Sequence, residues 1–238
     1  MSSNVEGFKY ESEVISTLIE SGLAGNITEG AGASSADADA DIYINGEYHL
    51  VEVKKDLYAQ MGGTSVRYSG GKFEPVGKAI EGDTFEIVSS ALATKEEDLQ
   101  RLLGFLGQEG FPFTCTKEAW DTAKVAGLLK PINTKVKKDT TFLAEHYAQK
   151  GVNYIQIGGA GLFHLGNNPA GLPVPELVGE IDIELRAGRS GSKPSATGEP
   201  VVGGSLRAQG RLKFHGLSPY TLDDANSIAA MVREIKGE

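Results

Sequence analysis

Three residues in the first quarter of the chain have the types and spacing that metal-assisted cleavage of a phosphodiester would need: Asp41, Glu52 and Lys54. Two carboxylates are hard oxygen ligands that hold Mg²⁺ and leave coordination positions for water and phosphate. The metal polarises the phosphoryl oxygen and helps to generate hydroxide. An adjacent lysine ammonium group can stabilise the transition state or orient the attacking water. The backbone carbonyl of Val53 would be a neutral metal ligand.

A predicted β-hairpin brings these residues together. Asn45-Gly46 between two β-rich runs is a strong signal for a two-residue hairpin turn. Because side chains alternate along a strand, Glu52 and Lys54 project to the same side. Counting outward from the turn, we expect Asp41 to lie roughly level with Glu52. Asp39 has the same parity and is the competing acid, but Asp41 directly adjoins the first strand and is preferred.

The alternative interpretation is that Glu52 and Lys54 decorate a solvated strand. Leu50-Val51 and Val53 beside them form a run typical of a buried strand. Unpaired charges are costly in such a place, and this favours a functional site.

A helix is predicted over residues 5–22, because apolar side chains recur there at helical spacing. Glu11 lies three residues after Phe8 and four before Ile15, which places it on the inward face. Acids rarely face inward without a partner, so Glu11 would serve either a metal or a partly buried salt bridge.

In order and content, residues 5–65 resemble the PD-(D/E)xK nuclease superfamily, which includes restriction enzymes, phage exonucleases, resolvases and some homing endonucleases. Asp41 stands at the aspartate of the motif and Glu52-Val53-Lys54 at its (D/E)xK tripeptide. Ala40 replaces the proline of the named motif.

The resemblance implies a fold, a cofactor and further site residues. The fold would be α/β, a restriction-endonuclease-like mixed β-sheet core flanked by helices, with a β-rich C-terminal half. Glu11 would be the additional glutamate on the first helix, and Gln60 the glutamine that follows the lysine in several members. The cofactor would be Mg²⁺, with Mn²⁺ able to substitute. The implied metal ligands are Asp41, Glu52, Val53 and Glu11.

The strand predicted from Ser205 to His215 has one apolar and one basic face. A β-ribbon of this kind can lie against DNA, where arginine and glutamine read guanine and adenine edges. An ordinary surface strand, polar outward and apolar inward, is the alternative. The predicted DNA-contacting residues, including those of the preceding Gly- and Ser-rich segment, are Arg186, Arg189, Lys193, Arg207, Gln209, Arg211 and Lys213.

The charge and cysteine content restrict the class of protein. A formal net charge of −9 argues against nonspecific coating of nucleic acid. Acids dominate residues 1–52 and bases dominate residues 186–215, which suits a metal-binding end joined to a phosphate-binding surface. A single cysteine, Cys115, excludes an intrachain disulfide and a Cys-rich zinc site.

The chain also lacks the marks of a membrane or secreted protein. No apolar run approaches the roughly 20 residues that span a bilayer, and the first residues lack the pattern of a signal peptide. We therefore expect a cytoplasmic protein of a bacterial or phage-infected cell.

The predicted elements change near residue 150, from mainly helices to mainly strands, and this suggests how the chain is divided. Residues 1–150 would form the nuclease core and residues 151–238 a β-rich DNA-contacting region packed on it, as two parts or as one continuous domain. Residues 56–77 are predicted to be a polar, extended loop with a short hairpin. Further helices are predicted within 84–108, 117–129, 139–150 and 221–236, and further strands at 154–157, 162–165, 181–185 and 205–215.

Together these features predict a Mg²⁺-dependent DNA endonuclease that acts on double-stranded DNA. It would be sequence-directed, of the restriction or homing type, and active as a monomer or a homodimer. The alternatives are an exonuclease or junction resolvase of the same superfamily, and a non-catalytic DNA-binding phage protein on a nuclease scaffold.

Overall fold

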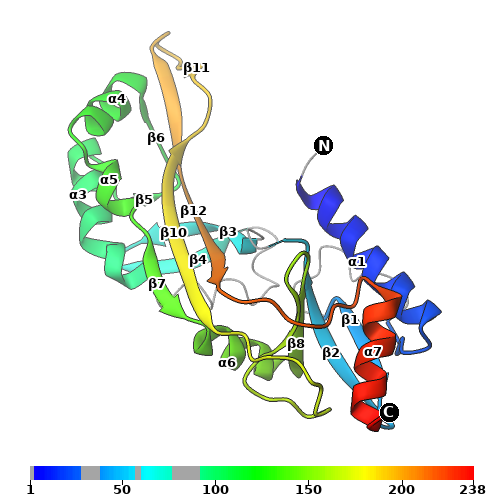
Figure 1. Ribbon diagram of the computed structural model, residues 1–238. Coiled ribbons are helices and arrows are strands. Elements are labelled where there is room, and N and C mark those ends of the chain that lie inside the picture. The colour runs from blue at the N-terminus through cyan, green and yellow to red at the C-terminus, as the bar shows by residue number, and fades with distance from the viewer. Residues whose placement is uncertain (1–2, 28–37, 57–59, 77–91) are drawn as a thin grey trace. The chain divides into compact units, whose positions relative to one another are not determined.

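The computed structural model of the protein describes residues 3–27, 38–56, 60–76 and 92–238, with the backbone alone for 3–4 and 60–63. The chain folds into two compact units, coloured along the sequence in Figure 1. The first unit comprises Met1–Ala59, Lys138–Ile181 and Leu212–Glu238, and the second comprises Gln60–Lys137 and Asp182–Arg211. A cut at residue 150 would pass through the middle segment of the first unit.

The first unit contains a four-stranded mixed sheet in the order β1-β2-β8-β9. β1 (Ala40–Ile44) and β2 (Glu47–Lys54) are antiparallel, β2 and β8 (Val152–Ile157) are parallel, and β8 and β9 (Gly161–His164) are antiparallel. The predicted hairpin is confirmed. Asn45 and Gly46 both have positive φ, 54° and 86°, as a two-residue hairpin turn of this hand requires.

Three helices accompany this sheet: α1 (Ser3–Glu20), α6 (Thr141–Gln149) and α7 (Ala225–Lys236). α1 and α7 touch each other beside β1 and β2 (Figure 1). Side chains that recur at helical spacing in both helices join alternate residues of the strands in one apolar cluster. Its fully buried members include Val14, Leu18, Ala40, Ile42, Val51, Val53, Ile228 and Met231.

This cluster determines where Asp41 of β1 and Asp39, just before the strand, project. Ala40, Ile42 and Ile44 are buried in the apolar cluster. Because side chains alternate along a strand, Asp39 and Asp41 project from the opposite face of the sheet. A one-residue slip would expose the apolar set, so burial of that set holds the register.

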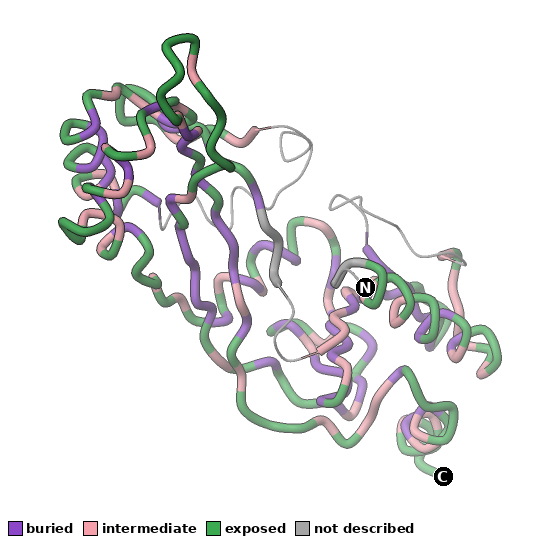
Figure 2. The backbone as a smooth tube through the Cα atoms, turned by 90° about the horizontal axis from the view of Figure 1, so that it is seen from above, coloured by how far each residue is buried: buried purple, intermediate pink, exposed green. Residues whose placement is uncertain are grey.

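An eight-stranded sheet lies largely in the second unit, with the central order β4-β3-β12-β10-β7. Its strands are β3 (Gln60–Ser69), β4 (Lys72–Val76), β5 (Gly110–Phe111), β6 (Phe113–Thr116), β7 (Val136–Asp139), β10 (Gly179–Arg189), β11 (Lys193–Pro194) and β12 (Pro200–Phe214). Its helices are the 3-10 turn η2 (Ala93–Lys95), α3 (Glu96–Leu106), α4 (Lys117–Val125) and α5 (Leu129–Ile132). Buried and exposed positions alternate along much of β12, whereas β10 contains a run of five buried residues. Figure 2 shows the burial along the backbone.

The structure confirms the α/β class and most predicted elements. One difference is the segment predicted as an extended loop with a short hairpin, where β3 and β4 pair through the turn at Gly70-Gly71 as full members of the sheet. Thr64, Val66 and Tyr68 alternate inward and are each 2% exposed, so the polar composition hid a half-buried strand. Of the helix predicted at 84–108, residues up to 91 lie outside the described residues, and η2 and α3 occupy most of the rest. Among the described helices, none is long and apolar enough to cross a membrane.

Candidate active site

The pairing of β1 with β2 determines which aspartate lies beside Glu52. The register runs outward from the turn to Asp41↔Leu50 and Ala40↔Val51. One further step places Asp39 opposite Glu52. The expectation that Asp41 lies level with Glu52 is therefore wrong by two residues, and the competing acid takes that place.

The carboxylate of Asp41 is hydrogen-bonded to the backbone of the segment that follows α1. Its two carboxylate oxygens accept hydrogen bonds from the amides of Asn26 and Ile27, at 2.8 and 2.9 Å. Gly25 packs so closely that a Cβ there would lie 2.1 Å from Oδ2 of Asp41. Asp41, only 3% exposed, holds this segment on the edge of β1.

Asp39 lies at the end of the sheet where Glu52 and Lys54 project. Its Oδ2 accepts a hydrogen bond from the amide of Val53, at 2.8 Å, and lies 3.9 Å from Nζ of Lys54. Burial, followed by the negative charge of Glu52, raises the pKa of Asp39 to about 7, although Lys54 and the Val53 amide oppose the shift. The positive charge near this carboxyl group therefore does not offset its burial and the charge of Glu52.

Lys54 connects the two acids. Its Nζ forms an ion pair with Oε1 of Glu52, as the shared face of β2 predicts, and the side chains of both residues are only 18% and 12% exposed. Burial acts to lower the pKa of Lys54, but the charges of Glu52 and Asp39 outweigh it and the pKa lies above its ordinary value. Lys54 therefore remains a cation in the folded protein.

Tyr147 is a site residue that the sequence did not reveal. It projects from α6, is 4% exposed, and donates its hydroxyl to Oε1 of Glu52 at 3.0 Å. Burial and the charge of Glu52 raise its pKa well above the ordinary value, so it remains a donor. The available signal was weak: a tyrosine on the inner face of a predicted helix, whose hydroxyl would need a partner.

Glu11 contributes a further carboxylate from α1. Its Oε2 is buried and has no hydrogen-bond partner within the described part of the chain. Burial raises its pKa, with the charge of Glu52 adding to the shift and that of Lys54 opposing it. Glu11 is thus electrostatically part of the same group, and its open oxygen favours a ligand role over a completed salt bridge.

The donor set fits a hard divalent cation. Asp39, Glu52 and Glu11 supply carboxylate oxygens. Oε2 of Glu11 has no hydrogen-bond partner among the described residues, and the pKa of Asp39 is raised. In the residues that the structure describes, no three or more His, Cys, Asp or Glu side chains form a ready-made metal cage. Mg²⁺ does not need one, because it commonly takes one or two protein carboxylates and completes its shell with water and phosphate.

Gln60 belongs to another part of the chain. Its backbone begins β3 and pairs with Arg211 in the second unit. Its side chain lies outside the described residues.

The residues predicted to contact DNA do not form one exposed row. Gln209 is only 4% exposed and donates to Oε2 of Glu184 at 3.0 Å, so its predicted contact with a base edge is not available in this structure. The pairing of β12 with β3 shifts between Gln209 and Gly210, with the extra residue in β3, and Arg211 is half-buried. The acid that accepts this hydrogen bond, Glu184, lies on the neighbouring strand β10.

The other predicted bases are exposed. Arg207 and Lys213 project outward from β12, and Lys193 from β11. Arg186 is paired with Glu184 at 2.8 Å but its side chain is 57% exposed. Arg189 approaches Asp121 at 4.0 Å. These cations are distributed over several strands.

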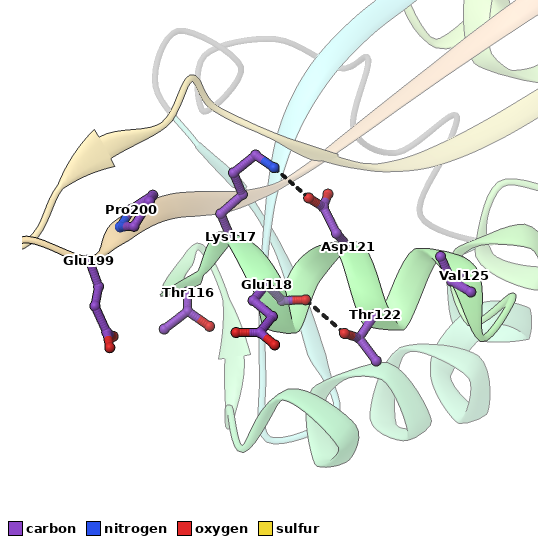
Figure 3. Close-up of a pocket in the computed structure, with 8 residues that line it drawn as sticks. All are labelled: Thr116, Lys117, Glu118, Asp121, Thr122, Val125, Glu199 and Pro200. Carbon is purple, nitrogen blue, oxygen red and sulfur yellow. Dashed lines mark hydrogen bonds and ion pairs between the residues drawn. The ribbon is translucent and has the colours of Figure 1, made fainter.

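A separate hollow of about 640 Å³ lies along α4 (Figure 3). Its lining carries the carboxylates of Glu118, Asp121 and Glu199, and Lys117 is paired with Asp121 at 2.7 Å. This balance of charge disfavours a phosphate there. None of the residues around Lys54 lines it.

No protein-family model, no curated protein and no solved structure matches this chain.

Proposed function

We propose that this protein is a Mg²⁺-dependent DNA endonuclease of the PD-(D/E)xK kind, with its active site on a restriction-endonuclease-like β1–β2 hairpin. One observation carries the proposal. Nζ of Lys54 lies between the carboxylates of Asp39, just before β1, and Glu52 of β2, in a partly buried position. Burying two acids and a lysine together is unfavourable for stability alone, and the combination is the one that hydrolysis of a phosphodiester uses.

Asp39 and Glu52 would hold Mg²⁺ or Mn²⁺, with the carbonyl of Val53 and the free oxygen of Glu11 as further donors. Such a metal, when bound, polarises the phosphoryl oxygen and lowers the pKa of its water. The amide of Val53 fixes the orientation of Asp39 through its 2.8 Å hydrogen bond. Tyr147 orients Glu52 in the same way from the other side.

Lys54 would act on the phosphate itself. Its ammonium group is fixed by Glu52 and has a pKa above the ordinary value, so it keeps its proton at neutral pH. A fixed cation beside the phosphorus stabilises the charge that develops on the phosphoryl oxygens in the transition state. Lys55, the next residue, points elsewhere and pairs with Glu6.

DNA would be bound through exposed cations of β10, β11 and β12. Arg186, Lys193, Arg207 and Lys213 are exposed, and each can neutralise one phosphate. The overall charge of −9 keeps nonspecific attraction low. This combination favours an enzyme that selects its sites.

Cleavage of supercoiled plasmid tests the proposal. Purified protein is incubated with plasmid and linear DNA in Mg²⁺, Mn²⁺ or EDTA, alongside the Asp39→Asn variant. We expect nicked and linear products from wild type in either metal, and none with EDTA or with Asp39→Asn. Degradation of linear DNA alone would indicate an exonuclease. DNA binding without cleavage in either metal would overturn catalysis and leave a binding protein.

A further inference from the structure

A polar network with a buried centre lies beneath α1, on the face of the sheet that carries the apolar core. At its centre is Gln156 of β8, which is fully buried. Its Nε2 donates to the hydroxyl of Tyr10 at 2.9 Å and to Oγ1 of Thr221 at 2.8 Å. Its Oε1 accepts from the amide of Leu222 at 3.0 Å. Every hydrogen-bonding group of this amide is used.

The network closes on Asp223. The hydroxyl of Tyr10 donates to Oδ2 of Asp223 at 2.6 Å, and Oγ1 of Thr221 donates to Oδ1 at 2.5 Å. Tyr10 thereby links three separate segments: α1, the strand β8 and the turn before α7. A leucine at position 156 could fill the same volume without a desolvated amide, so the network specifies geometry more than it adds stability.

Two further contacts fix α1 at the same end of the sheet. Lys55, at the end of β2, forms an ion pair with Glu6. Gly158 fills the narrow space beside it: its amide donates to the carbonyl of Lys54 at 2.8 Å, and a Cβ there would lie 2.0 Å from the carbonyl of Lys55 and 3.1 Å from the ring of Tyr10. The α1 helix is therefore fixed directly beside the (D/E)xK strand.

We propose that Tyr10 and Gln156 form a positioning pair, which fixes α1 on the sheet so that the carboxylate of Glu11, the next residue, reaches the group formed by Asp39, Glu52 and Lys54. The ligand role of Glu11 rests on the proposed function, whereas the fixing of α1 does not. Consecutive helical residues project in directions about 100° apart, because a turn contains 3.6 residues. Holding Tyr10 on Gln156 thus determines the direction of Glu11.

The test compares two tyrosines whose hydroxyls are used alike. Tyr10→Phe removes the hydroxyl from the network. The matched control is Tyr154→Phe on β8, the strand that carries Gln156. It removes a hydroxyl that donates to Asn168 at 2.7 Å and accepts from the amide of Ala170 at 2.9 Å. The measurements are the urea midpoint, amide hydrogen exchange in α1 and α7, Mn²⁺ affinity by calorimetry without DNA, and kcat and KM for plasmid cleavage.

We expect both variants to lower the urea midpoint similarly. Only Tyr10→Phe should speed exchange in α1, and it should weaken Mn²⁺ binding and lower kcat by about 10-fold, the usual scale for residues that orient a metal ligand, with KM unchanged. In a Glu11→Gln background, Tyr10→Phe should have no further effect on Mn²⁺ affinity, because the carboxylate it positions is already gone.

Equal losses of kcat and Mn²⁺ affinity in the two tyrosine variants would overturn the positioning role, as would an undiminished effect of Tyr10→Phe in the Glu11→Gln background. If wild type neither binds Mn²⁺ nor cleaves DNA, the proposed function fails by itself. Amide exchange then decides the structural part, and equal protection of α1 in both variants overturns it.

Discussion

The hydroxyl of Tyr147 lies 3.0 Å from Oε1 of Glu52, across 95 positions of sequence. The same oxygen forms the ion pair with Lys54. One carboxylate oxygen is thus held by a neutral donor from α6 and a cation from β2. In the proposed site, the second oxygen of Glu52 would bind the metal.

Removing this hydroxyl should impair chemistry more than folding. We expect Tyr147→Phe to lower kcat about 10-fold with little change in KM, because an outer residue that orients a metal ligand typically has effects of 10–100-fold. The unfolding free energy should fall by only about 1 kcal/mol, the usual net value of one hydrogen bond. Plasmid cleavage and urea unfolding measure the two effects. A kcat equal to that of wild type would show that Glu52 needs no second donor.

Asp39 and Asp41 should respond in opposite ways to mutation. Asp39→Asn should abolish cleavage, because it removes a charge from the proposed metal site, and should leave stability equal or higher, because a buried charge disappears. Asp41→Ala should lower the unfolding free energy by about 1–3 kcal/mol, since the amides of Asn26 and Ile27 lose their acceptor. The folded fraction of Asp41→Ala should still cut DNA. Normal cleavage by Asp39→Asn, with a dead but stable Asp41→Ala, would reverse the assignment.

The contrast between these two aspartates shows what the sequence could determine. The turn residues Asn45 and Gly46 predict the hairpin, and a strict two-residue turn already pairs Ile44 with Glu47. Continuing that pairing reaches Asp39 at Glu52. Adjacency to the apolar run suggested Asp41 instead. The sequence could not show that the carboxylate of Asp41 accepts two backbone amides, because the segment that donates them follows a path that no local pattern predicts.

Other parts of the site could not be inferred from local patterns at all. Tyr147 and Gln156 reach their partners through tertiary packing, and neither lies near the motif in sequence. In β12, alternation predicted that Gln209 would share the exposed face of Arg207. Gln209 is instead buried and donates to the neighbouring acid Glu184 of β10. Local periodicity predicts elements well, but partners across a sheet depend on the whole fold.

Lys54 and Lys55 provide a matched pair of adjacent lysines. Lys54→Met should lower the rate of cleavage by orders of magnitude while DNA affinity stays near that of wild type, because a fixed cation at the phosphate acts mainly on the transition state. Lys55→Met should change the rate little, since Lys55 pairs with Glu6 on α1. Single-turnover cleavage and DNA binding in Ca²⁺ separate rate from affinity. Similar rate losses in both variants would indicate a general effect of charge.

Asp39 should make the metal-free protein less stable as the pH rises. Its pKa is about 7 in the folded protein against an ordinary 3.8, so between these values the folded state holds more protons than the unfolded state. The stability linked to this group is fully present below about pH 4 and is lost as the pH rises through 7. The difference in unfolding free energy between wild type and Asp39→Asn should therefore fall across this window, by at most about 1.4 kcal/mol per pH unit.

Urea unfolding in EDTA from pH 4 to pH 8 measures this difference, and the Asp39→Asn reference cancels the other titrating groups. Saturating Mg²⁺ should reduce the slope, because a bound cation stabilises the ionised carboxylate. A flat difference in EDTA would mean that Lys54 compensates Asp39 fully.

The exposed and buried polar residues of β12 should differ in their effect on DNA binding. Arg207→Ala and Lys213→Ala should each lower the salt dependence of DNA affinity by about one unit, as expected when one phosphate contact is lost. Gln209→Ala should leave that slope unchanged and should lower the unfolding free energy instead, because its amide is buried against Glu184. Fluorescence anisotropy of labelled duplex DNA in Ca²⁺, over a range of salt concentrations, measures the slopes. If neither Arg207→Ala nor Lys213→Ala changes affinity or slope, β12 faces solvent, and DNA contact must come from other cations such as Arg186 and Lys193.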